Sequence, residues 1–165
     1  MKIGIGYDIH RLVPRRPMVL GGVKIKFPKG CYGHSDGDVL LHAICDAILG
    51  ALGEPDIGAR FPDTDAKYKN ISSVEFLRDV ERLTREKKYE ICNLDAVVIA
   101  EEPKISDYRM EIIAAIAKVL RIPESRVNVK GKTAEKLGEI GACRAIASYA
   151  AVLLAKKKGR TRACK

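Results

Sequence analysis

The chain has no tryptophan, and aromatic residues make up only 5% of its 165 residues. A hydrophobic core must therefore be mainly aliphatic. No apolar run approaches the roughly 20 residues that a helix needs to cross a bilayer. The chain also starts with glycine and polar residues among the apolar ones, unlike the continuous apolar stretch of a secretory signal. These absences predict a cytoplasmic protein of one domain that does not bind a membrane.

The five cysteines are widely spaced, odd in number and never arranged as C-x-x-C. This pattern argues against a disulfide framework and against a zinc site made of thiolates. Reduced thiols, as in a cytosolic protein, fit the pattern better.

Acidic residues are absent from the last ten positions, which hold six of the 30 Lys and Arg residues. The net charge is +9, but without this segment 24 basic residues face 21 acidic ones. We expect a solvated chain end here. Weak attraction to nucleic acid or phosphorylated ligands is the alternative. The scarcity of aromatic side chains for base stacking argues against an RNA-binding module, so we expect no nucleic-acid partner.

Histidine is also scarce, and all three histidines lie within the first 42 residues. Residues 2–10 alternate, so Ile3, Ile5, Tyr7 and Ile9 share one face of a strand, while Gly4, Gly6, Asp8 and His10 share the other. Asp8 and His10 would then lie about 6.6 Å apart along the strand. Two imidazoles and a carboxylate suit zinc, with His42 as the third ligand. From spacing alone, ordinary polar surface residues remain the alternative.

Hydrophobic periodicity predicts an α+β (α/β layered) domain. We expect a single mixed sheet of about four or more strands, with helices packed on one face. The helix that carries His42 would bury an aliphatic stripe and place Asp38, His42 and Asp46 together on another face. The predicted strands are residues 2–10, 19–27, 94–100 and 126–130, and the predicted helices are about 35–50, 73–87, 106–120 and 143–157.

A second polar cluster spans residues 130–136 (KGKTAEK). Its lysines, hydroxyl and loop amides suit phosphate groups, and Glu135 suits a hard cation such as Mg²⁺. A solvated charged loop is the alternative. The segments 56–58 and 61–65 are typical of ordinary turns.

Nine short motifs follow one another along the chain: residues 6–11 (GYDIHR), 20–23 (LGGV), 34–42 (HSDGDVLLH), 50–51 (GA), 56–58 (DIG), 61–65 (FPDTD), 103–104 (PK), 128–130 (NVK) and 133–138 (TAEKLG). In order and spacing, from residue 3 to about residue 153, the chain resembles the 2-C-methyl-D-erythritol 2,4-cyclodiphosphate synthase family. Together these matches are far more specific than any one of them.

The resemblance implies a metal-dependent phosphorus–oxygen lyase of the non-mevalonate isoprenoid pathway. The family converts 4-diphosphocytidyl-2-C-methyl-D-erythritol 2-phosphate into the cyclic diphosphate and CMP, since the 2-phosphate attacks the β-phosphorus. Its members are homotrimers with active sites between subunits. We therefore expect residues 1–157 to be a single catalytic domain, residues 158–165 to be a basic tail, and three copies to assemble.

Matched to the family's motifs, Asp8, His10 and His42 would bind Zn²⁺ or another divalent metal, and Glu135 would bind Mg²⁺ or Mn²⁺. His34 and Thr133 would be catalytic. Ser35 and residues 56–58 and 61–65 would hold the methylerythritol end, and residues 100–106 of a neighbouring subunit would hold cytosine. The full expected set of substrate-binding residues is Asp8, His10, His34, Ser35, Asp56, Ile57, Gly58, Phe61, Pro62, Asp63, Thr64, Asp65, Ala100, Pro103, Lys104, Ile105, Ser106, Lys132, Thr133, Ala134 and Glu135.

The chain departs from the family in two places. The family usually reads F-x-G-R-G-E-G where residues 139–145 read EIGACRA, so Ala142 replaces the Arg and Arg144 replaces the Glu. In the family these positions lie near the trimer axis, beside a cavity reported to accept isoprenoid diphosphates, and we expect Arg144 to supply substitute positive charge there. Lys132 stands where Thr is common. A zinc phosphohydrolase of nucleoside diphosphate compounds, which uses water, is the alternative function for the same ligands.

Overall fold

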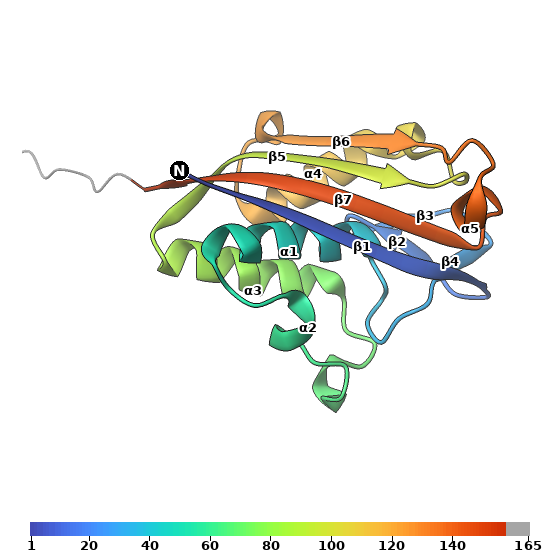
Figure 1. The fold of residues 1–165 in the computed structure, drawn as a ribbon, viewed down its shortest axis with the longest axis horizontal. Helices are drawn as coiled ribbons and strands as arrows, with labels where there is room; N and C mark the ends of the chain where they lie inside the picture. The colour runs from blue at the N-terminus through green and yellow to red at the C-terminus, as the bar shows by residue number, and fades with distance from the viewer. Residues whose placement is uncertain (158–165) are drawn as a thin grey trace, which may run out of the picture.

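The computed structural model describes residues 1–157 as one sheet covered by helices (Figure 1). The predicted basic tail, residues 158–165, lies outside the described residues. The strands are β1 Lys2–Pro14, β2 Met18–Leu20, β3 Val23–Ile25, β4 Lys29–Cys31, β5 Tyr89–Ile99, β6 Val127–Lys132 and β7 Ala145–Lys156. The helices are α1 Val39–Leu52, α2 Ile57–Arg60, α3 Ser73–Glu86, α4 Arg109–Leu120 and α5 Gly138–Gly141, with short 3-10 turns at Ala66–Tyr68, Ile105–Asp107 and Glu124–Arg126.

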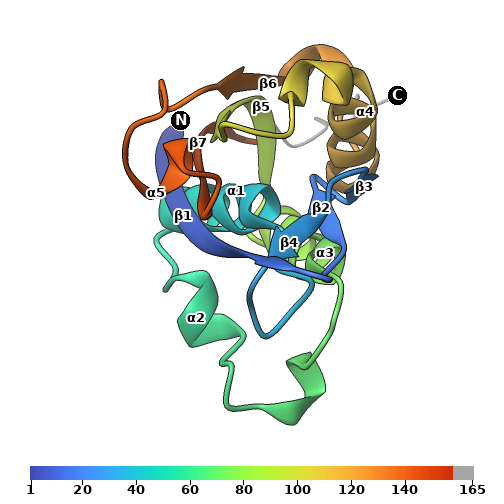
Figure 2. The same ribbon diagram turned by 90° about the vertical axis from the view of Figure 1, so that its right-hand side faces the viewer.

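Five strands form the main sheet in the order β4-β1-β7-β5-β6, and β2 and β3 form a separate hairpin. The sheet is mixed because β5 and β6 are parallel while all other neighbours are antiparallel. Helix α1 packs on β1 and β7, α3 contacts β5, and α4 packs on β6. In Figure 2 the sheet curves around α1, with α3 and α4 on the same side. The predicted α+β class and the mixed sheet with helices on one face are thus confirmed.

The helix predicted at residues 143–157 is wrong, because this segment forms β7 at the centre of the sheet. Its run of alanine and leucine has high intrinsic helix propensity, which misled the prediction. The strand pairs on both edges, with β1 and with β5, and Ile146, Ser148, Ala150, Val152 and Leu154 are all buried. Pairing on two sides therefore overrides local propensity.

The strand predicted at residues 19–27 is also wrong, since the chain reverses within it to form the β2–β3 hairpin. Gly21 and Gly22 occupy the turn with φ of 61° and 79°. Positive φ at both central residues belongs to the tight turns that match the twist of paired strands, and glycine adopts it without strain. The turn predicted at residues 28–30 largely becomes β4, which pairs with the end of β1.

The buried side of β1 is made by glycine instead of large side chains. A Cβ added at Gly4 would lie 1.9 Å from the carbonyl oxygen of Ala47, and one at Gly6 would lie 2.0 Å from that of Ala43. The strand backbone therefore rests directly on α1, which brings Asp8 beside the helix. The apolar face of β1 points away from the helices, and the side chains of Ile3 and Ile5 are 77% and 74% exposed.

We expect Gly6→Ala to lower the free energy of unfolding by about 3 kcal/mol, because the added methyl group forces β1 away from α1. Gly50→Ala is the matched control: the nearest atom to its added Cβ is the carbonyl oxygen of Ile5 at 3.9 Å. This control should raise stability by up to about 1 kcal/mol, since alanine favours a helix over glycine. Thermal and denaturant unfolding followed by circular dichroism measure both. Equal stability of the two variants would contradict the close packing of β1 on α1.

Candidate active site

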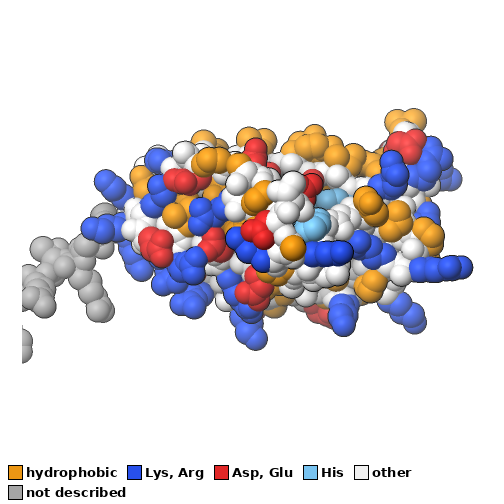
Figure 3. Space-filling view, turned by 90° about the horizontal axis from the view of Figure 1, so that it is seen from below, with side chains coloured by type: hydrophobic (Ala, Val, Ile, Leu, Met, Phe, Trp, Pro, Cys, Tyr) orange, Lys and Arg blue, Asp and Glu red, His pale blue; other side chains and the backbone are white. Residues whose placement is uncertain are grey.

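Three predicted ligands converge where β1 meets α1. Asp8 Oδ2 lies 2.9 Å from His10 Nε2 and 2.9 Å from His42 Nδ1, and the two ring nitrogens lie 3.1 Å apart. Among the described residues this is the group of three that can offer ligand atoms to one metal ion. The side chains are partly exposed, and histidine atoms reach the surface on the side below the sheet (Figure 3). A small ion in solvent can therefore reach them.

Helix α1 presents His42 to this cluster through a narrow polar stripe. Every residue of α1 is buried except His42, Asp46 and Gly50, which recur at four-residue spacing. His42 and Asp46 share this face as predicted, but Asp38 does not, because it precedes the helix, is fully buried and accepts the N–H groups of Gly21 and Gly22. The helix begins at Val39 with Asp38 as its N-cap, and Asp38 Oδ1 accepts the N–H of Leu41 at 3.1 Å. The helix therefore starts after residues 35–38, which were predicted to be helical.

The donor set fits a divalent cation. His10 Nδ1 lies 2.8 Å from the carbonyl oxygen of Tyr32, which can only accept, so His10 donates from Nδ1 and keeps a lone pair on Nε2. Nε2 can therefore ligate a metal ion; without one, a proton on Nε2 would be donated to the Asp8 carboxylate at 2.9 Å. Zinc–ligand bonds of about 2.0–2.2 Å place tetrahedral ligands roughly 3.3 Å apart, so a small opening of the cluster accommodates the ion. The residues fit a divalent metal, and the same geometry admits more than one kind.

The three side chains of the cluster also shift the pKa values of Asp8 and His10. Burial opposes charge on Asp8, but hydrogen bonds and charges from His10 and His42 outweigh it and hold the pKa of Asp8 well below its usual value. Burial likewise disfavours the charged form of His10, but the Asp8 carboxylate outweighs it and raises the pKa of His10. Asp8 is therefore an anionic ligand across the neutral pH range.

A small cavity of about 120 Å³ adjoins the cluster. The stacked rings of Phe61 and Phe76, with centroids 4.5 Å apart, form its apolar wall. His34 lines it, and His34 Nε2 is buried without a hydrogen-bond partner within the described chain. A buried unpaired nitrogen is costly unless a ligand completes it. The full lining is His34, Ser35, His42, Ile57, Gly58, Phe61, Asp63, Tyr68 and Phe76.

The remaining residues predicted near this cavity support its walls. Asp56 caps α2 by accepting the N–H of Ala59 at 2.8 Å, and Asp65 accepts the N–H of Lys67 at 3.1 Å. Pro62, Thr64 and Asp65 do not line the cavity. Asp46, which belongs to none of the predicted site segments, accepts the N–H of Ile57 at 2.8 Å and so ties α2 to α1.

A larger cavity of about 980 Å³ lies at the other edge of the sheet, between the loop after β5 and the end of β6. A Cβ at Gly131 would lie 2.8 Å from that of Ile105, so glycine lets the loop rest on β6. Thr133 Oγ1 donates to Glu135 Oε1 at 2.6 Å just beyond the rim. The predicted residues that line this cavity are Ala100, Pro103, Lys104, Ile105, Ser106, Lys132 and Thr133, whereas Ala134 and Glu135 do not.

The two halves of the predicted site do not meet within one chain. Ile9, Ala147, Ile99 and Lys132 form one row across four adjacent strands. At about 4.8 Å per strand, Ile9 and Lys132 are roughly 14 Å apart. Neither cavity contains a lining residue of the other.

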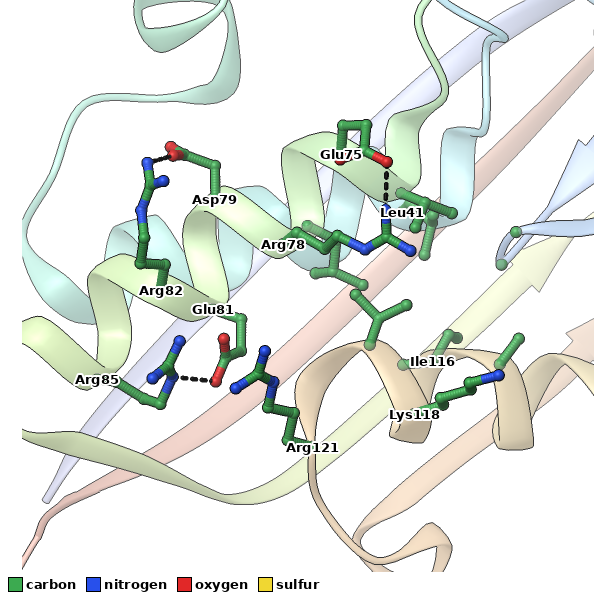
Figure 4. Close-up of a pocket in the computed structure, with 16 residues that line it drawn as sticks. Leu41, Glu75, Arg78, Asp79, Glu81, Arg82, Arg85, Ile116, Lys118 and Arg121 are labelled. Carbon is green, nitrogen blue, oxygen red and sulfur yellow. Dashed lines mark hydrogen bonds and ion pairs between the residues drawn. The ribbon is translucent and has the colours of Figure 1, made fainter.

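A third cavity, of about 730 Å³, lies between α3 and α4 and contains none of the predicted site residues (Figure 4). None of the sequence motifs indicated this cavity. Three of its arginines form ion pairs with acids on α3: Arg78 with Glu75, Arg82 with Asp79, and Arg85 with Glu81. These pairs neutralise much of the positive charge that an anionic ligand would require.

Arg144 is also paired, which weakens the expectation that it supplies free positive charge. Its Nε and Nη2 atoms donate to the carboxylate of Glu139 at 2.7 and 2.6 Å. Both residues line a shallow cavity of about 540 Å³ on the outer face of β1. Cys31, Cys45, Cys92 and Cys143 are free thiols, as predicted for the described part of the chain.

The fold and these cavities define an α+β protein with a candidate metal centre beside a small cavity lined by His34 and aromatic rings. Within residues 1–157, no helix is long and apolar enough to span a membrane. The model of the YgbB family matches residues 1–155, and the chain belongs to that family.

Similar proteins carry a consistent name. A protein of Desulfatibacillum aliphaticivorans named 2-C-methyl-D-erythritol 2,4-cyclodiphosphate synthase is 56% identical over 141 residues, which are 86% of this chain and 91% of that protein. A solved structure described as IspF of Plasmodium falciparum in a CDP complex is 47% identical, with a TM-score of 0.85 and coverage of 95% and 97%. The bifunctional IspDF of Campylobacter jejuni is 44% identical, with a TM-score of 0.89. That match covers 93% of this chain but only 42% of the bifunctional protein.

Proposed function

We propose that this chain cyclises 4-diphosphocytidyl-2-C-methyl-D-erythritol 2-phosphate to 2-C-methyl-D-erythritol 2,4-cyclodiphosphate with release of CMP. This reaction belongs to non-mevalonate isoprenoid precursor biosynthesis. The observation that carries the proposal is the Asp8, His10 and His42 cluster beside the His34 cavity, in a chain whose relatives are named for this activity. We also propose that residues 1–157 are the catalytic domain and that the enzyme works in the cytoplasm.

Both the nucleophile and the electrophile belong to the substrate, so the protein need not supply a nucleophile. Its task is to fold one molecule until two phosphates meet in line and to offset their mutual repulsion. Zn²⁺ or a similar ion held by Asp8, His10 and His42, together with Mg²⁺ or Mn²⁺ at Glu135, would supply positive charge for that approach. The unpaired His34 Nε2 supports a role for His34 in binding a phosphate oxygen.

The larger cavity supports a cytidine site. The CDP complex of the Plasmodium structure supports a cytidine nucleotide as ligand class. Backbone groups of the loop after β5 and the side chain of Lys104 would bind the base, and Lys132 and Thr133 would face the diphosphate.

We propose that three copies assemble so that this cytidine cavity of one copy meets the metal cluster of the next. The separation of roughly 14 Å between Ile9 and Lys132, which mark the two halves of the site within one chain, supports this arrangement. So does the exposed apolar face of β1 and β7, where Ile3, Ile5, Tyr7, Ile9 and Tyr149 are between 42% and 77% exposed.

Ile5→Asp is expected to convert the trimer to monomers, because a charge would replace an apolar side chain that another copy covers. Met110→Asp is the matched control, since Met110 is 61% exposed but lies on α4. Sedimentation velocity should give three times the chain mass for the wild type and the control. A wild-type monomer with full activity would contradict shared active sites.

Product analysis by ³¹P NMR tests the proposed reaction. A cyclase yields the cyclic diphosphate and CMP from the purified substrate. A metal phosphohydrolase with the same ligands would yield a linear bisphosphate and CMP. The names of the relatives do not favour that second function. Formation of the linear product alone would replace the proposal.

A further inference from the structure

His42 has a second ring nitrogen, and it ends a buried chain of hydrogen bonds. His42 Nε2 lies 2.9 Å from Ser73 Oγ, and Ser73 Oγ lies 2.5 Å from Asp36 Oδ1. Ser73 is fully buried at the start of α3. Water is therefore excluded from Ser73, while Asp36 and His42 are partly buried, and the protein groups around Ser73 decide which one donates.

The direction of this chain follows from its acidic end. An ionised carboxylate can only accept, so the Ser73 hydroxyl proton points to Asp36. Asp36 Oδ2 also accepts the N–H of Ser73 at 3.0 Å, which holds the carboxylate in place. Because the Ser73 hydroxyl has one proton, its oxygen can only accept from His42 Nε2. A proton on Nε2 leaves Nδ1 able to ligate a metal ion held with Asp8 and His10; without a metal, the Asp8 carboxylate 2.9 Å away attracts a proton to Nδ1.

We propose that Asp36 and Ser73 are positioning residues that fix the tautomer and ring orientation of His42 for metal binding. A metal requires a lone pair on the ligating nitrogen, and a partner on the other ring nitrogen commonly secures it. Without Asp36, the Ser73 hydroxyl can donate to His42 Nε2, and the proton of the ring then moves to the nitrogen that must face the metal.

Ser35 does not replace this chain. Its hydroxyl oxygen lies 3.2 Å from His42 Nε2 and accepts the N–H of Gly37 at 3.1 Å. It also lies 3.4 Å from Ser73 Oγ, where it can donate its own proton. Ser35 therefore contacts His42 without a carboxylate behind it to set the direction of its proton.

Two variants interrupt the chain, and one neighbour serves as a control. Ser73→Ala removes the hydroxyl, and Asp36→Asn can present an N–H group to Ser73. Ser72→Ala removes the N-cap of α3, where Ser72 Oγ accepts the N–H of Val74, but does not touch His42. If the variants acted only by destabilising the start of α3, Ser72→Ala would lower the affinity for Zn²⁺ as well.

Competition with a chelator, using Zn²⁺ alone as the probe on the full chain, measures metal affinity. We expect Ser73→Ala and Asp36→Asn each to lower it about 10- to 100-fold, with Ser72→Ala unchanged. The double variant should lose no more than the stronger single one, because both act through one chain. In the metal-free protein, where Asp8 attracts a proton to Nδ1, ¹⁵N NMR should show His42 Nε2 protonated in the wild type and less protonated in Asp36→Asn.

The inference rests on the proposed metal site, and the experiment separates the two. A wild type that does not bind Zn²⁺ overturns the metal site, while the NMR tautomer still reports on the chain. A wild type that binds Zn²⁺ while both variants bind it within threefold overturns the positioning role. Additive losses in the double variant would also overturn it, since separate effects would then be at work.

Discussion

Replacing His42 with alanine is expected to remove the bound divalent metal and to lower the cyclisation rate about a thousandfold or more. The substitution leaves Asp8 and His10 as the two remaining ligands of the cluster. A loss of about 4 kcal/mol of charge stabilisation corresponds to that factor, since about 1.4 kcal/mol is tenfold. Metal content after dialysis against limiting Zn²⁺, measured by mass spectrometry, and single-turnover rates give the two quantities.

His10→Ala should behave in the same way, because His10 Nε2 faces the same carboxylate oxygen of Asp8 at 2.9 Å. The matched control is Asp46→Asn, since Asp46 shares the polar stripe of α1 with His42 but bonds the backbone N–H of Ile57. It should retain full metal content. If His42→Ala retained its metal and its rate, the cluster would not be the metal site.

Replacing His34 with alanine is expected to give the opposite combination, with full metal content and a rate lower by about 10²- to 10³-fold. His34 is not among the three converging ligands. Its Nε2 is buried, unpartnered within the described chain, and lines the cavity beside His42. Removing one preorganised donor to a developing negative charge typically has an effect of this size.

The comparison of kcat with metal content separates His34 from the ligands. His34→Ala should lower kcat more than it raises KM, because the interaction strengthens as charge develops on the phosphate. Loss of metal from His34→Ala to the same extent as from His42→Ala would place His34 among the ligands and contradict the division of roles.

Much of the candidate site was predictable because its residues follow local rules. Period-two alternation placed Asp8 and His10 on one face of β1, and four-residue spacing placed His42 on a polar stripe of α1. That these two elements touch was not visible in the periodicity. It depends on Gly4 and Gly6, whose missing side chains admit the helix backbone.

The largest error, the helix predicted at residues 143–157, has long-range pairing as its physical cause. Residues 145–156 form a strand because β1 and β5 are available on either side, and no window of the local sequence reports those neighbours. Ser73 was missed for the same reason. It lies 31 positions from His42 in the chain and was predicted only as the start of a helix.

The most direct test of the central claim is the metal dependence of cyclisation, followed by ³¹P NMR on the purified enzyme and substrate. We predict that the cyclic diphosphate and CMP form with the metal-loaded enzyme, that both stop forming after a chelator removes the metal, and that Zn²⁺ restores them. Cyclisation that continues undiminished in the metal-free enzyme would contradict the account.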